Sequence, residues 1–181
     1  MAGAGITIDV DDAELKHALG KLQKFVKSGL QPTMDEIGAR LEMSTLRRFE
    51  TETAPSGEPW ERSQAADRRG RPGSDRRRGQ TLTASGRLRD SITRFVSGDS
   101  VVVGTNVEYA AIHQFGGKTP PRTIRPKTKK ALSWPGAAHP VAKVEHPGSK
   151  MPERAFLGVS SGDEKAIVAI IDARVGEAWS A

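Results

Sequence analysis

VVVGTNVEYAAIHQFGG, residues 101–117, begins with a β-strand pattern, continues with a short helical pattern and ends on two glycines. Asn106 is a good N-cap for the helix, and the glycine pair is a natural helix end. Tyr109 and His113 stand four residues apart and therefore share one helix face. The stretch is either a tyrosine–histidine active site or a structural element that contains both residues.

The sequence around this pair offers little catalytic chemistry. No acidic partner follows His113, and phosphate-binding, dinucleotide-binding and G-x-S-x-G motifs are missing. With no cysteine and four histidines, a zinc site would need ligands from scattered positions. We therefore expect no catalytic residue, no metal and no cofactor. We expect a structural helix in which Tyr109, Ile112 and Phe115 face the core while His113 and Gln114 lie at its edge.

The composition indicates a modest core with polar extensions. Hydrophobic residues make up 36% of the 181 residues, which favours a compact core of roughly 110 to 130 residues. The net charge of +6 and the pI near 9.8 allow a polyanionic partner or an acidic protein ring without requiring either. The sequence shows no membrane-spanning run and no signal-peptide pattern, so we expect no membrane contact and a cytoplasmic start.

The N-terminal part predicts a strand and two helices. Residues 4–10 alternate apolar and polar side chains, and the helix after them is preceded by two capping aspartates and ended by Gly29. A second helix is expected to begin at Thr33, whose spacing to Glu36 fits a capping box. Apolar residues every three or four positions give this helix one core face, and Arg48 is assigned to the opposite face.

The middle of the chain predicts a short helix followed by a hairpin. Residues 83–92 fit a short capped helix in which Leu88 and Ile92 face the same way. Residues 93–97 and 100–104 have the pattern of two strands joined by a tight turn. The hairpin is the clearest strand prediction in the chain.

The C-terminal part predicts a strand and a third helix. A short strand is expected at residues 156–159, and Ser161 and Glu164 have the capping-box spacing of an amphipathic helix that follows. We therefore expect an α+β fold over residues 1–181 as a single domain. Its small antiparallel sheet would pack against two or three amphipathic helices, with long projecting loops or a hairpin.

Residues 54–82 form a long segment that is rich in Gly, Pro, Ser and Arg. Its arginines after Asp67 are Arg68, Arg69, Arg71, Arg76, Arg77 and Arg78. A segment of this length is either functional or disordered. An electrostatic contact to DNA or to an acidic partner and a solvated surface loop both stay open. Trp60 is expected to anchor the segment to the core, and the lack of interleaved aromatics argues against base stacking.

Residues 118–151 form a second unusual segment, which is basic and proline-rich. Two strand-like runs within it suggest extended arms, and the prolines confine such strands to edges or projecting hairpins. The segment is too poor in apolar residues for an independent domain, so we expect an insertion that reaches a neighbour, with a flexible loop as the alternative. The candidate contact residues are Arg122, Arg125, Lys127, Lys129, Lys130 and Trp134.

Four signals follow one another in order: LTASGRLRDSI, VVVGTNVEYAAIHQFGG, the basic proline-rich segment, and MPERAFLG before the final helix. Together they resemble the phage virion morphogenesis family, the Mu-like proteins of tail completion and head–tail joining, over residues 33–175. The basic segment also resembles neck proteins of siphophages. The motif residues are Tyr109, His113, Gln114, Gly116, Gly117, Phe156 and Leu157. The Arg-rich run at 67–80 departs from the family pattern, which puts its role in doubt.

The resemblance implies a structural virion protein of a tailed phage and no enzymatic activity. The implied subunit forms a ring, a hexamer, at the neck or head-proximal end of the tail, after assembly in the host cytoplasm. Its implied partners are other copies of itself, portal, connector or stopper proteins, and tail-tube or terminator proteins. Residues 118–151 would be the inter-subunit arm, joining a neighbour by strand addition, and the Arg-rich segment would face DNA in the lumen or an acidic ring.

Three functions are therefore weighed. The first is a neck or tail-completion protein, with a tail terminator ring as its variant. The second is a basic DNA-binding assembly factor, which the Arg-rich segment and the pI favour. The third is a hydrolase that uses His113.

Overall fold

The computed structural model describes residues 13–28, 30–69, 79–128, 130–133 and 139–180. The chain divides into two compact units. The first contains Met1–Arg47, Ile92–Thr105 and Val159–Ala181, and the second contains Arg48–Ser91 and Asn106–Gly158. The strand expected at 4–10 and the aspartates after it lie outside the described residues.

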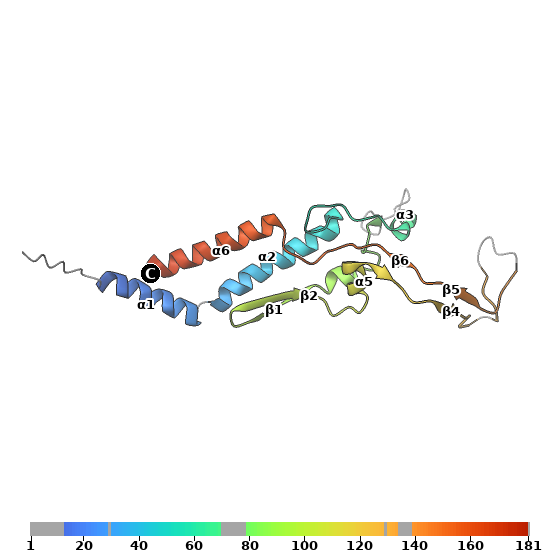
Figure 1. The fold of residues 1–181 in the computed structure, drawn as a ribbon, viewed down its shortest axis with the longest axis horizontal. Helices are drawn as coiled ribbons and strands as arrows, with labels where there is room; N and C mark the ends of the chain where they lie inside the picture. Colours follow the sequence, from blue (N-terminus) through green and yellow to red (C-terminus); the bar gives the residue numbers. More distant parts are fainter. Residues whose placement is uncertain (1–12, 29, 70–78, 129, 134–138, 181) are drawn as a thin grey trace, which may run out of the picture. The chain divides into compact units, whose positions relative to one another are not determined.

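The first unit is built from helices and one β-hairpin (Figure 1). Its elements are α1 (Ala13–Ser28), most of α2 (Leu30–Thr51), β1 (Thr93–Ser97), β2 (Ser100–Gly104) and α6 (Ser161–Ser180). The predicted hairpin is confirmed with its predicted bounds, and Phe95 lies opposite Val102 in the antiparallel register. Gly98 makes the turn with a φ of 59°, a left-handed conformation that glycine adopts without a steric penalty.

α2 begins earlier than the sequence pattern suggested. The helix starts at Leu30, and Thr33 is buried within it. Pro32 is compatible with this start, because a proline in the first helical turn has no intrahelical N–H bond to lose. The predicted capping box of Thr33 and Glu36 is therefore wrong. Glu36 instead accepts a charged hydrogen bond from Arg174 of α6 at 2.8 Å.

α6 begins with a capping box that is one residue away from the predicted pair. Ser160 Oγ accepts the Asp163 N–H at 3.2 Å, and Asp163 Oδ2 accepts the Ser160 N–H at 3.1 Å. Asp163 is buried and also accepts a 2.9 Å hydrogen bond from Ser44 of α2. The reciprocal capping bonds join Ser160 and Asp163, so the predicted pair of Ser161 and Glu164 is wrong.

The second unit has an aromatic centre. The Phe49 ring lies 5.5 Å from Trp60, edge to face, and 5.3 Å from Phe156, and all three side chains are buried. Trp60 thus anchors the segment after it, as expected. The short helices of this unit are α3 (Gln64–Arg69), α4 (Arg87–Asp90) and α5 (Ala110–Phe115). α4 is shorter than the helix predicted at 83–92, although Leu88 is buried as expected.

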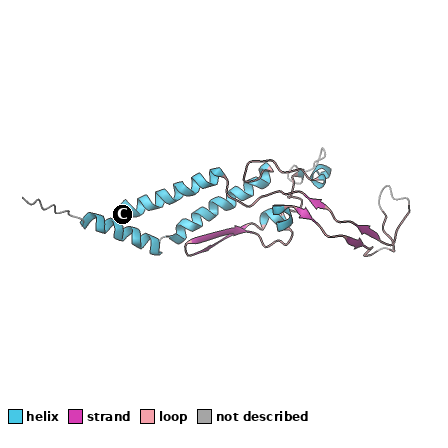
Figure 2. Ribbon diagram, viewed as in Figure 1, coloured by secondary structure: helices cyan, strands magenta, loops and turns pink. Residues whose placement is uncertain are grey.

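The described residues between 117 and 151 form a narrow antiparallel ladder, which we call the arm (Figure 2). β3 (Gly117–Lys118) pairs with β6 (Lys150–Met151), and β4 (Arg122–Ile124) pairs with β5 (Val144–His146). An isolated bridge between Leu132 and Val141 continues the pairing. The six helices and the three two-stranded antiparallel sheets of the described residues confirm the α+β class.

The strand predicted at 156–159 is not formed. These residues have no strand assignment, although the chain there is fully described. The prediction rested on apolar, β-prone side chains, which do bury Phe156. The backbone, however, finds its hydrogen-bond partners on side chains instead of on a neighbouring strand, as described next.

Candidate functional site

The segment 154–158 is held in the second unit mainly by side chains. Gln114 of α5 makes three of the bonds: its Oε1 accepts the N–H groups of Phe156 at 3.1 Å and Leu157 at 2.9 Å, and its Nε2 donates to the Leu157 carbonyl at 3.0 Å. A carboxamide carries both donors and an acceptor. Gln114 therefore satisfies this backbone as a neighbouring strand would.

Arg48 and Trp60 bind three further carbonyl groups of the segment. Arg48 Nη1 donates to the carbonyl oxygens of Phe156 at 3.0 Å and Gly158 at 2.8 Å. Trp60 Nε1 donates to the carbonyl oxygen of Ala155 at 2.9 Å. We call this set of bonds, with those of Gln114, the Gln114 lock.

Two arginines of this site are buried and were not among the predicted site residues. Arg48 is buried, so its assignment to the solvent-facing side of α2 is wrong: the two carbonyl groups hold the guanidinium inside. Its position three residues after Thr45 and seven after Leu41 was the available signal, because those residues share the apolar stripe. Arg154 is also buried, donating from its backbone N–H to the His113 carbonyl at 2.7 Å.

Two glycines let the chain approach closely around the lock. Gly116 ends α5 with a φ of 66°, as expected for one of the two motif glycines, and a Cβ there would lie 2.9 Å from the backbone nitrogen of Glu153. Gly158 has a φ of 146°, and a Cβ there would lie 2.8 Å from Pro55 Cγ. Both positions therefore favour glycine through conformation and through space.

The predicted orientation of the motif helix is wrong. Tyr109 and Phe115 are 42% and 76% exposed instead of facing the core, while Gln114 is half-buried in the lock. α5 spans only six residues and its N-cap position is Tyr109, so Asn106 does not cap it. A helix this short is oriented by its few tertiary bonds more than by an apolar stripe.

His113 lies at the boundary between the lock and the surface. Its ring contacts Tyr109 edge to face at 6.0 Å, and its buried Nδ1 has no hydrogen-bond partner among the described residues. Burial lowers the pKa of His113, and the nearby Arg154 guanidinium lowers it further. The imidazole is therefore kept neutral in the folded chain.

The described residues contain no group of three or more His, Asp or Glu side chains arranged to hold a metal ion. A search of their helices for a membrane-spanning segment likewise finds none with sufficient length and apolar character.

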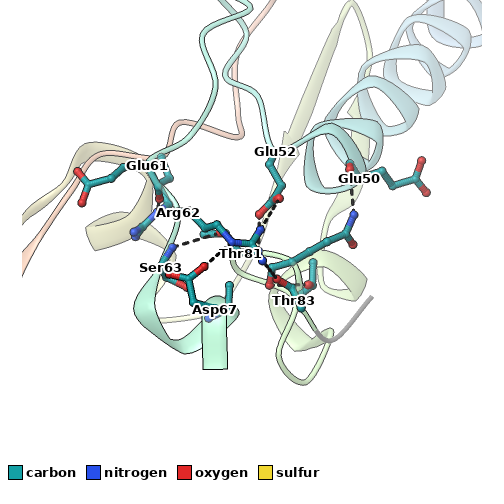
Figure 3. A network of polar contacts seen from close by, with 12 residues as sticks. Glu50, Glu52, Glu61, Arg62, Ser63, Asp67, Thr81 and Thr83 are labelled. Atoms are coloured by element: carbon teal, nitrogen blue, oxygen red, sulfur yellow. Dashed lines mark hydrogen bonds and ion pairs between the residues drawn. The ribbon is translucent and has the colours of Figure 1, made fainter. Parts of the chain in front are cut away.

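The two ends of the Arg-rich segment are fixed to each other (Figure 3). Arg62 donates to Asp67 and to the carbonyl oxygen of Gly79, the latter at 2.9 Å. Glu52, just after α2, pairs with Arg62 at 3.3 Å and accepts the Thr81 N–H. The chain therefore leaves and returns at one anchored point of the second unit.

Only some of the predicted contact residues are described. Arg68 and Arg69 lie in α3, whereas Arg71, Arg76, Arg77, Arg78, Lys129 and Trp134 lie outside the described residues. Four of the predicted contact cations in the arm are exposed, with Arg122 in β4 and the others after it: Arg122, Arg125, Lys127 and Lys130. On the paired strand, Glu145 accepts a hydrogen bond from Thr123 at 2.6 Å, which lowers the pKa of the Glu145 carboxyl, as does Lys143.

The side chain of the motif residue Gln114 thus bonds the chain to itself. A model of the phage virion morphogenesis family matches residues 10–176, and the chain belongs to that family. The chain is also similar to Mu-like prophage FluMu G protein 2 of Haemophilus influenzae, with 32% identity over 114 residues that cover 62% of this chain and 72% of that protein. No solved structure matches the chain significantly. The family resemblance predicted from the order of motifs is confirmed.

Proposed function

We propose that the chain is a structural, non-catalytic subunit of a tailed-phage virion that forms a ring at the neck or head-proximal end of the tail. In this role it completes the tail and joins it to the head. The observation that carries the proposal is the family match over residues 10–176. The Gln114 lock supports it, because the motif residues Gln114, Gly116 and Phe156 are used for folding.

The arm supplies one of the contacts that such a ring needs. β4 and β5 pair with each other and have no third strand among the described residues, so each keeps a free edge. An exposed edge is a template for strand addition by another chain. We propose that the arm contacts another copy in the ring and that the ring, a hexamer, binds portal, connector or stopper proteins on one side and tail-tube or terminator proteins on the other.

The proposal is tested by interrupting the gene in the phage or prophage that carries it and supplying the chain from a plasmid. Without the chain, we expect separate heads and tails by electron microscopy and a loss of infectious titre, both restored by the wild-type chain. Antibody labelling should place the chain at the junction of head and tail in complete particles. Normal titre without the chain, or its absence from purified virions, would overturn the proposal.

The hydrolase alternative is separated by a variant at the motif histidine. His113→Gln keeps a polar side chain of similar reach and removes acid–base catalysis. If the chain acts structurally, this variant should restore infectious titre as the wild type does, provided that circular dichroism shows it to be folded. A folded His113→Gln chain that failed to restore titre would favour catalysis.

A DNA-binding assembly factor is the second candidate, and the exposed arm cations favour it: Arg122, Arg125, Lys127 and Lys130. Binding carried by phosphate contacts weakens steeply with salt, with a slope that reflects the number of contacts. Titration with duplex DNA at salt concentrations from about 50 to about 200 mM tests the DNA-binding candidate. Absence of binding at the low-salt end removes this candidate, and a slope that falls when the four cations are replaced by alanine supports it.

A further inference from the structure

α6 carries apolar side chains on two faces. One face is turned toward α1 and α2, as the bonds from Arg174 to Glu36 and from Ser44 to Asp163 show. A second stripe is exposed, with side chains between 38% and 57% accessible at Val168, Ile171, Val175 and Trp179. Their spacing of three, four and four residues places them on one side of the helix. A helix that is apolar on both sides is typical of one that is buried on both sides.

The hairpin of the same unit also has an exposed apolar face. Phe95 and Val102 are cross-strand neighbours, and they are 70% and 64% exposed. The other face of the hairpin lies on α2, where a Cβ at Gly38 would come within 2.6 Å of Val101 Cγ2. Arg94, also on that face, binds Asp35 of α2 at 3.0 Å. The exposed pair is therefore the outward face of a hairpin that is fixed on its inner side.

The two elements that carry these apolar faces lie on opposite sides of α2. The hairpin contacts α2 at Asp35, Gly38 and Glu42, whereas α6 contacts it at Glu36 and Ser44. At about 100° per residue, these two sets lie roughly half a turn apart on the helix. Figure 1 shows the same order, with α2 between α6 and the hairpin. A face on each side of one body allows a copy to contact two neighbours at once.

Both faces are nearly free of charge and similar in length. The outward hairpin residues beside Phe95 and Val102 are Thr93, Ser97, Ser100 and Gly104. On α6, Arg174 is already bound by Glu36 and Glu177, which leaves Asp172 beside the stripe and Glu164 and Lys165 one turn before Val168 as the nearest charges. The stripe from Val168 to Trp179 is about 16 Å long, and a five-residue strand is about 17 Å long. An uncharged face suits another apolar protein surface and not a polyanion.

We propose that the outward face of the hairpin on one copy of this chain binds the exposed α6 stripe of the next copy. Because the two surfaces differ and lie on opposite sides of α2, the contact is heterologous and repeats from copy to copy, as a closed ring requires. A symmetric pairing of two α6 stripes would leave Phe95 and Val102 uncovered. This inference rests on the proposed ring function and names the main interface of the ring, to which the three-residue edges of β4 and β5 in the arm add a weaker contact.

The test uses two full-length variants that remove one face each and keep the fold. The hairpin-face variant carries Phe95→Glu and Val102→Lys, an opposite-charge cross-strand pair. The helix-face variant carries Ile171→Glu and Val175→Lys, an i,i+4 pair that favours the helix. Met43→Asp on α2 is the matched control, since Met43 is an exposed apolar residue outside both faces. Circular dichroism verifies folding, and sedimentation velocity measures the size of the assemblies.

We expect the wild type and Met43→Asp to form oligomers, and each face variant alone to associate roughly 30-fold or more weakly, as loss of a hot spot does. The two variants mixed should form a one-to-one dimer and nothing larger, because one intact contact remains between them. Oligomers of the hairpin-face variant alone, a monomeric mixture, or a monomeric wild type would overturn this interface. The proposed function is judged separately, because its test is the infectious titre of a phage that lacks the gene and not the size of the assemblies.

Discussion

Replacing Gln114 with alanine tests the lock most directly. The change removes three hydrogen bonds, two from the N–H groups of Phe156 and Leu157 and one to the Leu157 carbonyl. Phe156 is buried, so water cannot easily replace its lost partner, whereas Leu157 is half-buried. At about 1 kcal/mol for each lost bond, the variant should lose roughly 3 kcal/mol of unfolding free energy.

This loss should be visible in thermal and local measurements. A chain of this size loses about 2 to 4 °C of Tm per kcal/mol, so the expected fall in Tm is roughly 6 to 12 °C by circular dichroism. Hydrogen exchange read by mass spectrometry should show faster exchange at residues 152–158. Gln23→Ala is the matched control, because Gln23 is exposed on α1, and it should change neither quantity.

Gln114→Glu separates lost bonding from lost volume. The side chain keeps its size and its acceptor oxygens, but at neutral pH it sets a carboxylate against the Leu157 carbonyl in place of the Nε2 donor. We expect a lower Tm at pH 7 than at pH 4 relative to the wild type, since a protonated carboxyl can donate again. A Gln114→Ala chain with an unchanged Tm and unchanged exchange at 152–158 would refute the lock as the element that holds this segment.

Two further perturbations follow from the same site. Gly158→Ala should lower the unfolding free energy by about 2 kcal/mol or more, because φ at this position is 146° and the added Cβ meets Pro55. Gly176→Ala in α6 is the control, because nothing lies near the added atom, and it should instead raise the unfolding free energy by about 0.5 to 1 kcal/mol. Urea unfolding measures both variants. Burial lowers the pKa of His113, so below pH 6.5 the unfolded chain binds a proton that the folded chain does not bind. The contribution of the neutral imidazole to the unfolding free energy is therefore complete above pH 6.5 and is lost as the pH falls toward the folded pKa. His113→Gln should therefore have a urea midpoint that declines less than that of the wild type between pH 7 and 5, and equal declines would contradict the neutral buried imidazole.

The elements that the sequence predicted well are those with local causes. The hairpin at 93–104 has alternating side chains and a glycine turn within twelve residues, and both strands match their predicted bounds. The predicted capping boxes were displaced by a few residues. At α6 the capping residue is Ser160 instead of Ser161, and its partner Asp163 is also bound by Ser44, which is far away in the chain. Helix ends are thus decided partly by residues far away in the chain.

Periodicity indicates the face of α2 on which Arg48 lies, but not the atoms that its guanidinium binds. Arg48 is buried because its partners, the carbonyl groups of Phe156 and Gly158, lie 108 and 110 residues further along the chain. The expected core face of Tyr109, Ile112 and Phe115 places Gln114 at the edge of its helix, and no local pattern distinguishes a glutamine that binds backbone. The motif order identified the family, but it did not identify which motif atoms meet.

The lock also explains why the two motifs occur on either side of the arm. The arm leaves α5 directly after Gly116 and returns at Met151, and a Cβ at Gly116 would lie 3.1 Å from the Met151 carbonyl oxygen. Bringing together the ends of such an excursion costs about 3 kcal/mol of loop-closure entropy, which two-residue strands such as β3 and β6 offset poorly. The three bonds of Gln114 are of the size needed to offset it. The motif before the arm therefore supplies the Gln114 carboxamide, and the motif after the arm supplies the backbone that it binds. Gln114→Ala should consequently speed hydrogen exchange in β3 and β6 as well as at 152–158.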